Sequence, residues 1–444
     1  MLFRMVRRAL QKLTAATAPK PAITVAIATY NWSRALRCAI RSVLLQTVQD
    51  FEILVVGDGC TDDTGAVVAE FNDPRLRWHN LDRNHGGQWA PNNYACENAA
   101  ADWIAYLGHD DIWYPTHLEA ILRTARETSA KVITSVAIMY GPPGSGVRSL
   151  AGLFATGSFS SRDFVPPSAF ANATSIYRDG VRWHDHDTMS LPTDLTFLRE
   201  AAAVGSVAST GELTCFKFNA AWRRDAYKTR TIDEQQRLLR SIESGVDFRQ
   251  QEYRDVLRAV ISGKFVPLEM PLAANAPAGS ITRQFRQWKG TDDRYDLSAL
   301  QRIDARVRFD MADQNMPFEW HGLETDPKFG SLRWTGPNAR ATIDLPVAFD
   351  RDLRLRIHVV VAAAAIDRVA LSIHGVAIPH HVARLDGGTF LLEGQLDHAT
   401  MAKPDRDFGI TLDVGETIRP MDAGLGEDRR WLGLAVNWCE LEPL

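Results

Sequence analysis

Continuous apolar runs alternate with helical patterns through the first part of the chain. Residues 23–28, 51–56 and 103–107 are short apolar runs, typical of strands buried on both faces. Between the first two, residues 36–44 place Leu, Ile and Val at helical spacing. Strands that alternate with helices at this pitch predict a doubly wound, mixed but largely parallel α/β sheet.

Further elements extend this pattern to about residue 266. We predict a short strand at 76–79, a helix at 91–101, strands at 131–140 and 215–221, and helices at 194–203, 232–242 and 253–261. The segment 141–190 is rich in Gly, Pro and Ser. It is expected to be irregular and to supply loops over a site.

The periodicity changes in the second half of the chain. A connecting segment rich in Pro, Ala, Gly and Arg is followed by short strand candidates at 339–345, 353–361, 369–374, 389–392, 408–412 and 431–438. Such a run predicts an antiparallel β-sandwich, jelly-roll-like. The expected organisation is an N-terminal segment 1–20, an α/β domain 21–266, a linker 267–298 and an all-β domain 299–444.

Composition narrows the function classes. The 444 residues carry a net charge of −4 without a long charge run, so nucleic acid is not an expected partner. The five cysteines are scattered and lack Cys-x-x-Cys spacing. They support neither a zinc site nor a disulfide framework, and a reduced, cytoplasmic setting is expected.

The first residues have an amphipathic character. No apolar run approaches the roughly 20 residues that span a bilayer, and no convincing signal peptide is present. As a helix, residues 1–13 would place apolar side chains on one face and basic ones largely opposite. Two interpretations remain: peripheral contact with the cytoplasmic face of the inner membrane, or packing on the protein itself.

The candidate chemistry centres on residues 103–115, W-I-A-Y-L-G-H-D-D-I-W-Y-P. Asp110 and Asp111 directly follow a buried strand, where ligands bind in open α/β sheets. Two carboxylates at such a strand end suit a hard divalent cation on substrate phosphates. On spacing alone, the two residues could equally cap the turn and the next helix.

Several motifs in order give a resemblance to a known family. They are I-T-V-A-I-A-T-Y-N at 23–31, S-V-L-L-Q-T at 42–47, F-E-I-L-V-V-G-D-G-C-T-D-D-T at 51–64, and 84–111 with its Y-L-x-x-D-D-x-W-x-P ending. Together these resemble a family 2 glycosyltransferase over about 200 residues. The resemblance implies a GT-A fold and transfer of a sugar from a nucleotide-sugar donor.

The resemblance also implies roles for individual residues. Asp110 matches the carboxylate that holds Mn²⁺ or Mg²⁺, and Trp113 the acceptor side. The residues expected to bind the nucleotide sugar are Thr29, Tyr30, Asn31, Asp58, Arg83, Asn93 and Asp111.

Inversion at the sugar carbon requires a carboxylate that takes the proton from the acceptor hydroxyl. The family carries it in a Glu-Asp-x-Asp stretch before an Arg-containing helix, and the matching residues here are T-D-L-T-F-L-R at 193–199. The resemblance therefore points to Asp194. A helix-start role would explain Asp194 equally simply, and Asp185 or Asp187 in the His-Asp-His-Asp stretch 184–187 would then replace it. That stretch could also hold a metal, although a polar loop is the preferred interpretation.

Three positions depart from the family pattern. Gly57 and Gly108 replace common first acids, and Thr193 replaces the Glu. The second change leaves Asp110 as the single clear metal carboxylate, with His109, Asp111 or a more distant group as candidates for a second ligand. The third weakens the assignment of the base.

The C-terminal half is similar to sandwich modules of bacterial polysaccharide enzymes. The similarity rests on Trp320, Arg333-Trp334 and D-R-R-W-L-G at 428–433. These aromatics could stack on sugar rings, but core positions are the preferred interpretation. The module would then hold the acceptor or a partner near the transferase site.

The sequence thus predicts an inverting, metal-dependent glycosyltransferase that builds a bacterial surface polysaccharide on a glycan or glycolipid acceptor. A nucleotidyltransferase would need a Gly-rich basic loop after the first strand, and residues 29–33 are not one. The alternative from another class is a glycan-binding or scaffolding protein with a decayed transferase domain.

Overall fold

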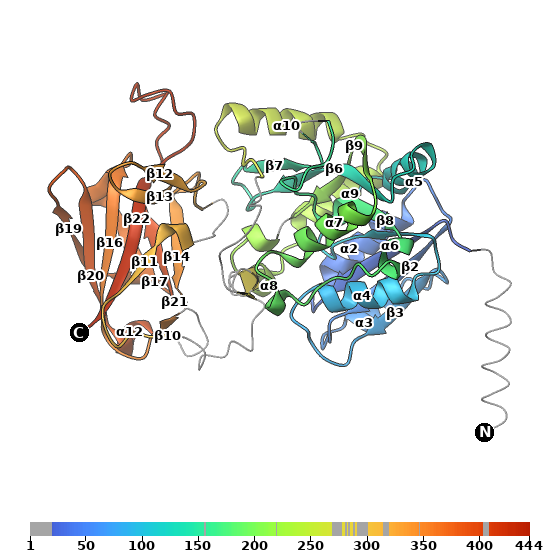
Figure 1. Cartoon of the computed structure of the whole chain (residues 1–444), viewed down its shortest axis with the longest axis horizontal. Helices are drawn as coiled ribbons and strands as arrows, with labels where there is room; N and C mark the ends of the chain where they lie inside the picture. The colour runs from blue at the N-terminus through green and yellow to red at the C-terminus, as the bar shows by residue number, and fades with distance from the viewer. Residues whose placement is uncertain are drawn as a thin grey trace.

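The computed structural model contains an α/β domain and an all-β domain that lie side by side (Figure 1). It describes residues 20–444 except 155–156, 219, 269–277, 280–281, 283–284, 287–288, 291–300, 314–318, 346 and 403–407. The predicted amphipathic segment 1–13 lies outside the described residues. No helix in the described ranges combines the length and apolar character that crossing a bilayer requires.

A nine-stranded mixed sheet organises the first domain, with strand order β3-β2-β1-β4-β8-β6-β9-β5 and β7 beside β6. The strands are β1 (Ile23–Thr29), β2 (Phe51–Gly57), β3 (Leu76–Asn80), β4 (Trp103–Tyr106), β5 (Ile112–Trp113), β6 (Val132–Tyr140), β7 (Arg148–Ala151), β8 (Phe170–Ala173) and β9 (Val207–Lys217). Strands β3, β2, β1 and β4 are parallel, whereas β8, β5 and β7 run antiparallel to their neighbours. The predicted mixed sheet is confirmed, but it is less parallel than expected, because four strand pairs are parallel, including β6 with β9, and four are antiparallel.

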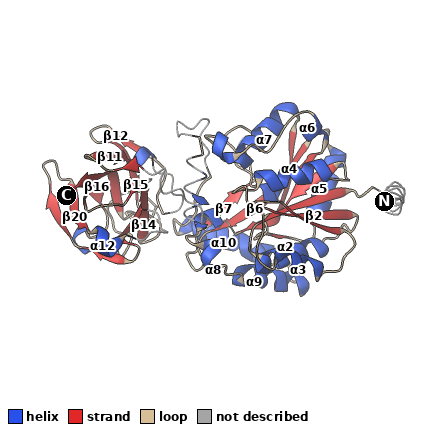
Figure 2. Cartoon of the chain, turned by 90° about the horizontal axis from the view of Figure 1, so that it is seen from below, coloured by secondary structure: helices blue, strands red, loops and turns tan. Residues whose placement is uncertain are grey.

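Helices cover both faces of this sheet. Figure 2 shows α2, α3 and α9 along one face, and α4, α6 and α7 along the other. The helices are α2 (Ser33–Leu44), α3 (Thr64–Ala69), α4 (Trp89–Asn98), α5 (His117–Glu127), α6 (Ser175–Arg178), α7 (Thr193–Val204), α8 (Ala226–Thr229), α9 (Asp233–Glu243) and α10 (Arg249–Ile261). Because β1 and β2 are covered on both faces, almost every residue in them is buried, which explains their continuous apolar runs.

The segment 141–190 is more regular than expected. It contains β7, β8, α6 and the 3-10 turns η1 (Pro167–Ala169) and η2 (His186–Thr188), and β8 pairs with both β4 and β6 inside the sheet. The prediction of an irregular segment was therefore wrong for these residues. A four-residue strand preceded by Pro166 and Pro167 is too short to give a periodic signal.

The second domain is an antiparallel β-sandwich, as predicted. A seven-stranded sheet has the order β12-β13-β22-β16-β20-β19 with β11 beside β22, and a four-stranded sheet has the order β14-β21-β17-β18. The longer strands are β14 (Arg340–Leu345), β16 (Leu353–Ala362), β19 (His380–Arg384), β20 (Phe390–Leu396), β21 (Phe408–Asp413) and β22 (Leu434–Pro443). Shorter elements are β10 (Gln301–Arg302), β11 (Val307–Asp310), β12 (Glu324–Asp326), β13 (Gly330–Trp334), β15 (Val347–Ala348), β17 (Ala370–Ile373), β18 (Val376–Ile378) and α12 (His398–Met401).

Apolar residues of both sheets share one core, including Ile343 and Ile410 from the smaller sheet and Ile357 and Val436 from the larger one. Trp320 is buried, and its Nε1 donates to the carbonyl of Thr342 at 2.8 Å. The preferred assignment of Trp320 to the core is therefore confirmed.

Candidate functional site

The site is built where parallel strands end. In the sheet, β1 lies between β2 and β4, and Thr29 at the end of β1 pairs with Gly57 at the end of β2. The loops after these strands therefore leave the same edge and diverge to opposite sides of β1. Such a point leaves a crevice at the carboxyl edge of the sheet. The residues brought together there include Thr29, Tyr30, Asn31, Asp58 and Asp110.

His109 links two of these loops. Its Nδ1 accepts a hydrogen bond from the Tyr30 backbone N–H at 3.3 Å and lies 2.9 Å from Thr29 Oγ1. Its Nε2 lies 3.1 Å from the Tyr227 hydroxyl. Burial lowers the pKa of His109 to about 4, so the ring is neutral at physiological pH. With both nitrogens engaged, His109 positions the loop after β1 and leaves no nitrogen for a metal.

Asn31 and Asp58 fix the loops on the other side of β1. Asn31 has a φ of 44°, and its Oδ1 accepts from the backbone N–H of Thr61 at 2.8 Å. A positive φ of this size is tolerated by Asn better than by most residues. The Asp58 carboxylate accepts from the backbone N–H of His85 at 2.9 Å and lies 3.0 Å from His85 Nδ1. Asp58 therefore holds the loop that carries Arg83, and its predicted hydrogen bond to a nucleotide base stays a prediction.

The neighbours Asp110 and Asp111 have different environments. Asp111 is fully buried, and its carboxylate accepts from Ser168 Oγ at 2.5 Å, from Lys217 Nζ at 3.0 Å and from the Phe218 N–H at 3.0 Å. Asp110 is also buried, with 7% of its surface exposed, yet its carboxylate makes no hydrogen bond or ion pair within the described part of the chain. Asp110 is therefore the carboxylate of the two that is available to bind a cation.

The donor set at Asp110 fits a divalent metal shared with a substrate. The oxygens of Asp111 and the nitrogens of His109 are already occupied. Asp110 would thus be the protein ligand, with diphosphate oxygens and water completing the coordination. Mg²⁺ commonly binds in this way, through one or two carboxylates together with substrate phosphates.

Sequence reasoning missed two lysines near Asp110 and an arginine against the loop of Gly86. Burial alone would lower the pKa of Lys217, but Asp111 and Asp110 outweigh it and raise this pKa. Burial lowers the pKa of Lys289 to about 8, while Asp110 opposes the shift. Arg286 lies against the backbone of Gly86, where an added Cβ would come within 2.6 Å of the guanidinium. The segment predicted as a linker thus brings two basic residues to the site. The spacing of three residues between Arg286 and Lys289 was the sequence signal that could have revealed these two site residues.

Asp194 lies at the start of α7, within electrostatic range of Lys217 and Lys289. Burial raises the pKa of its carboxyl, against a hydrogen bond from the Leu195 N–H at 2.9 Å and the charges of Lys217 and Lys289. The stacked rings of Phe197 and Trp183, with centroids 4.3 Å apart, anchor this helix. A raised pKa suits a carboxylate that must accept a proton.

Two predicted site residues support the fold in this structure. Trp113 is completely buried, stacks on His117 at 4.1 Å and donates from Nε1 to the Ser168 carbonyl. The Asn93 amide donates to the carbonyl of Trp183 at 2.8 Å and accepts from its N–H at 3.1 Å. The expected contacts of Trp113 and Asn93 with the substrates stay predictions.

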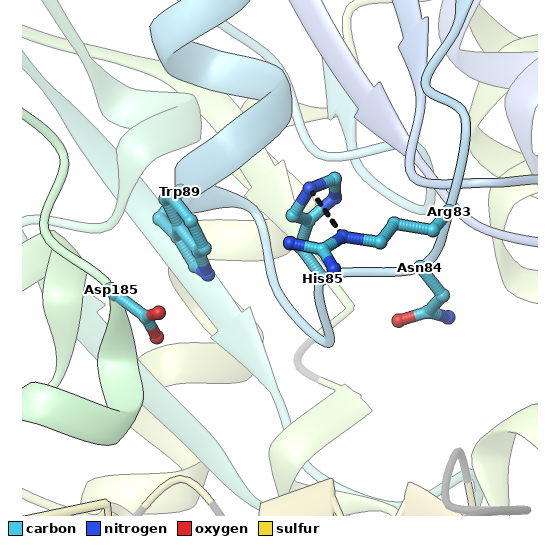
Figure 3. Close-up of a pocket in the computed structure, with 5 residues that line it drawn as sticks. All are labelled: Arg83, Asn84, His85, Trp89 and Asp185. Atoms are coloured by element: carbon cyan, nitrogen blue, oxygen red, sulfur yellow. Dashed lines mark hydrogen bonds between the residues drawn. The ribbon is translucent and has the colours of Figure 1, made fainter.

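A pocket of about 230 Å³ lies beside this edge of the sheet. It is lined by Arg83, Asn84, His85, Trp89 and Asp185 (Figure 3). Arg83 lies 3.5 Å from His85 through Nε and Nε2, and Asp185 faces the pocket from the opposite wall. The pocket combines a cation, amide and imidazole groups and an indole ring, which suits a polar ligand with a flat or sugar-like face.

Comparison with known proteins identifies the N-terminal part. Residues 24–167 match the family model described as glycosyl transferase family 2. The succinoglycan biosynthesis protein ExoO of Rhizobium meliloti is 37% identical over 112 residues, which are 25% of this chain and 32% of ExoO. The putative glycosyltransferase EpsH of Bacillus subtilis is 29% identical over 124 residues, 28% of this chain and 36% of EpsH. The chain therefore spans about a third of the length of these curated relatives.

Solved structures with similar architecture are more distant. Staphylococcus aureus TarS is 14% identical with a TM-score of 0.38, covering 88% of this chain and 76% of that one. A mannosyltransferase from Pyrobaculum calidifontis in complex with GDP-Man and Mn²⁺ is 13% identical with a TM-score of 0.37, covering 64% and 90%. These likenesses are too distant to bear on function.

The family match covers β1 to β4 and the loops that carry Thr29, Asp58 and Asp110, so it rests on the same residues as the site. The GT-A-like class expected for this domain agrees with the mixed sheet described above. Residues 24–167 of this chain belong to glycosyltransferase family 2.

Proposed function

We propose that this protein is an inverting, metal-dependent glycosyltransferase that acts on a nucleotide-sugar donor. The observation that carries the proposal is the buried, unpartnered carboxylate of Asp110 at the carboxyl edge of β4, among Lys217 and Lys289. The negative charge of a diphosphate would be attracted to these two lysines, and a divalent metal would bind both the diphosphate and the Asp110 carboxylate. Family membership of residues 24–167 supports this chemistry.

One set of residues would bind the nucleotide-sugar donor, and another residue would catalyse the transfer. Asp110 would hold Mn²⁺ or Mg²⁺, which neutralises the charge that develops on the leaving diphosphate. Lys289 and Arg286 would contact the diphosphate from the segment after α10. The loops of Thr29, Tyr30, Asn31 and Asp58 would hold the nucleotide, with Arg83 at the nearby pocket. Asp111 keeps the Asp110 loop in place through Lys217 and Ser168.

Asp194 would act as the base. The acceptor hydroxyl gives its proton to the Asp194 carboxylate while its oxygen attacks the anomeric carbon. The bond from that carbon to the diphosphate oxygen breaks on the opposite face, so the configuration inverts. The raised pKa of Asp194 brings its basicity closer to neutral pH and therefore favours this role.

The proposed acceptor is a glycan or glycolipid of a bacterial surface polysaccharide. The relatives ExoO, named for succinoglycan biosynthesis, and EpsH, a putative glycosyltransferase, support this choice. The β-sandwich would hold the acceptor or a partner near the site. Work at the cytoplasmic face of the inner membrane, with contact through residues 1–13, is part of the same proposal.

The test is release of nucleoside diphosphate from nucleotide sugars in the presence of glycan acceptors. The wild-type protein should release it with one donor class, and Asp194→Asn should bind that donor normally but lose transfer by at least about 100-fold. Asp187→Asn tests the alternative base on the preceding turn, and Glu200→Gln on α7 is the matched control, because Glu200 is an exposed carboxylate outside the proposed site. Near-normal transfer by Asp194→Asn together with loss in Asp187→Asn would move the base to the 185–187 turn.

A further inference from the structure

The turn before α7 carries three potential metal ligands that the proposed transfer does not use. Asp185, His186 and Asp187 each offer one ligand atom, and these atoms lie within 4.8 Å of one another. The distance from His186 Nε2 to Asp187 Oδ1 is 3.4 Å, and that from Nδ1 to Asp185 Oδ1 is 4.0 Å. Two ligands about 2.1 Å from a shared ion are separated by a distance like the one from Nε2 to Asp187, whereas Nδ1, on the other side of the ring, cannot bind the same ion.

The central imidazole of this group lies beside both carboxylates but makes no hydrogen bond within the described part of the chain. Only 1% of the His186 side chain is exposed, and neither ring nitrogen makes a hydrogen bond within the described part of the chain. Burying two polar atoms without hydrogen bonds destabilises the folded state. A bound ion would satisfy one of these nitrogens. The buried imidazole without a hydrogen bond is therefore evidence for an ion that is independent of the exposed carboxylates.

The structure holds this turn tightly against neighbouring segments. An added Cβ at Gly87 would come within 2.9 Å of His186 Nδ1, and one at Gly279 within 3.2 Å of Asp187. The N–H of Gly279 donates to the Met189 carbonyl at 2.9 Å. The imidazole is therefore fixed by backbone on one side, with Asp187 beside its other nitrogen.

The ligand set leaves room for further ligands. Three protein ligands with open coordination positions are typical of sites that bind a substrate or water, whereas structural sites are usually closed by four. Asp185 lines the pocket that Arg83 and Trp89 also line, so an ion here would be reached from that pocket (Figure 3).

We propose that Asp185, His186 and Asp187 bind a divalent transition-metal ion at the wall of this pocket, separately from the metal held by Asp110. The imidazole suits Zn²⁺ better than Mg²⁺ or Ca²⁺, and the two carboxylates also suit Mn²⁺. Arg286 and Lys289 also lie within electrostatic range of His186, so both carboxylates are needed for a net attraction. Removing one of them should abolish tight binding. This inference does not depend on the transfer reaction.

The test is a titration of the full-length protein with Mn²⁺ in the absence of nucleotide, with free Mn²⁺ measured by electron paramagnetic resonance. We expect the wild-type protein and Asp110→Asn to bind one ion each, and Zn²⁺ to displace it. Asp187→Asn and Asp185→Asn should each weaken binding by at least about 10-fold. The Asp187 side chain is exposed, and Asn at position 185 can still cap the turn, so both variants should fold.

Glu200→Gln is the matched control. Glu200 lies 2.9 Å from His184 in an exposed histidine–carboxylate pair on the same segment, and its loss should leave Mn²⁺ binding unchanged. Binding by Asp187→Asn as tight as in the wild-type protein would overturn the proposal. So would the absence of nucleotide-independent binding, or its loss in Asp110→Asn. If the wild-type protein transfers no sugar while Asp110→Asn still binds Mn²⁺, the proposed function is contradicted and the metal site at 185–187 is not.

Discussion

At the scale of single residues, the adjacent carboxylates of Asp110 and Asp111 have different roles. The sequence placed Asp110 and Asp111 at a strand end and indicated a cation site there. It could not show that Lys217, Ser168 and the Phe218 N–H occupy Asp111 and leave Asp110 unpaired, because those partners lie 57 to 107 positions away. Pairings over such separations depend on the whole sheet.

Asp111 should therefore matter for stability. Asp111→Ala leaves Lys217 and the Phe218 N–H without their buried acceptor and should lower the free energy of unfolding by about 3 to 5 kcal/mol. Urea denaturation measures this loss. The control is Asp179→Ala, whose pair with Lys131 is exposed and should contribute less than about 1 kcal/mol. Equal effects of the two substitutions would contradict the structural role of Asp111.

Lys289 gives the donor affinity a pH dependence. Its pKa is about 8 because burial disfavours the charged form, so the ammonium group is present below that pH and lost above it. Affinity for a nucleoside diphosphate with Mn²⁺ should fall as pH rises from 7 to 9, as isothermal titration would measure.

Lys289→Arg should keep affinity nearly constant over this range, because a guanidinium stays charged. Lys289→Met should bind weakly at every pH in the range. A pH profile of Lys289→Met that matches the wild-type profile would show that another group titrates.

At the scale of elements, the long buried strands and amphipathic helices were predictable, and the short elements were not. Strands β1, β2 and β6 and helices α7 and α9 lie within a few residues of their predicted bounds. Strand β8 has four residues, and its place between β4 and β6 is set by partners far along the chain. Local periodicity has no information about such insertions.

Helix α7 should position Asp194 through its aromatic contacts. Phe197 is fully buried, and its ring stacks on Trp183 and lies near Tyr106. Phe197→Ala should destabilise the protein by about 3 to 5 kcal/mol. It should also lower the transfer rate more than the donor affinity, because Asp110 and Lys289 lie on other elements. Rate and affinity that fall in parallel would contradict this division.

At the scale of the whole molecule, the two domains meet through specific contacts. Trp431 Nε1 donates to the Ser262 carbonyl at the end of α10, and an added Cβ at Gly263 would come within 2.3 Å of the Arg429 carbonyl oxygen. Figure 1 shows the sandwich beside the α/β domain. The sequence predicted both domains, but not that the D-R-R-W-L-G stretch would supply this contact.

Trp431→Ala should loosen the arrangement of the domains. The substitution removes the hydrogen bond to Ser262 and the indole that packs near Gly263, so the radius of gyration in small-angle X-ray scattering should increase. Trp438→Ala is the control, because Trp438 stacks on His358 within the sandwich. An unchanged radius for Trp431→Ala would show that other contacts fix the domains.

In the proposed function, Asp110 joins a metal to a nucleotide-sugar donor. Isothermal titration with UDP-, GDP-, CMP- and dTDP-sugars, with and without Mn²⁺, tests it most directly. We predict that one nucleotide class binds the wild-type protein only with the metal, and that Asp110→Asn loses this binding while remaining folded. Failure of every donor to bind the folded wild-type protein, or equal binding by Asp110→Asn, would contradict the claim and favour a glycan-binding protein with a decayed transferase domain.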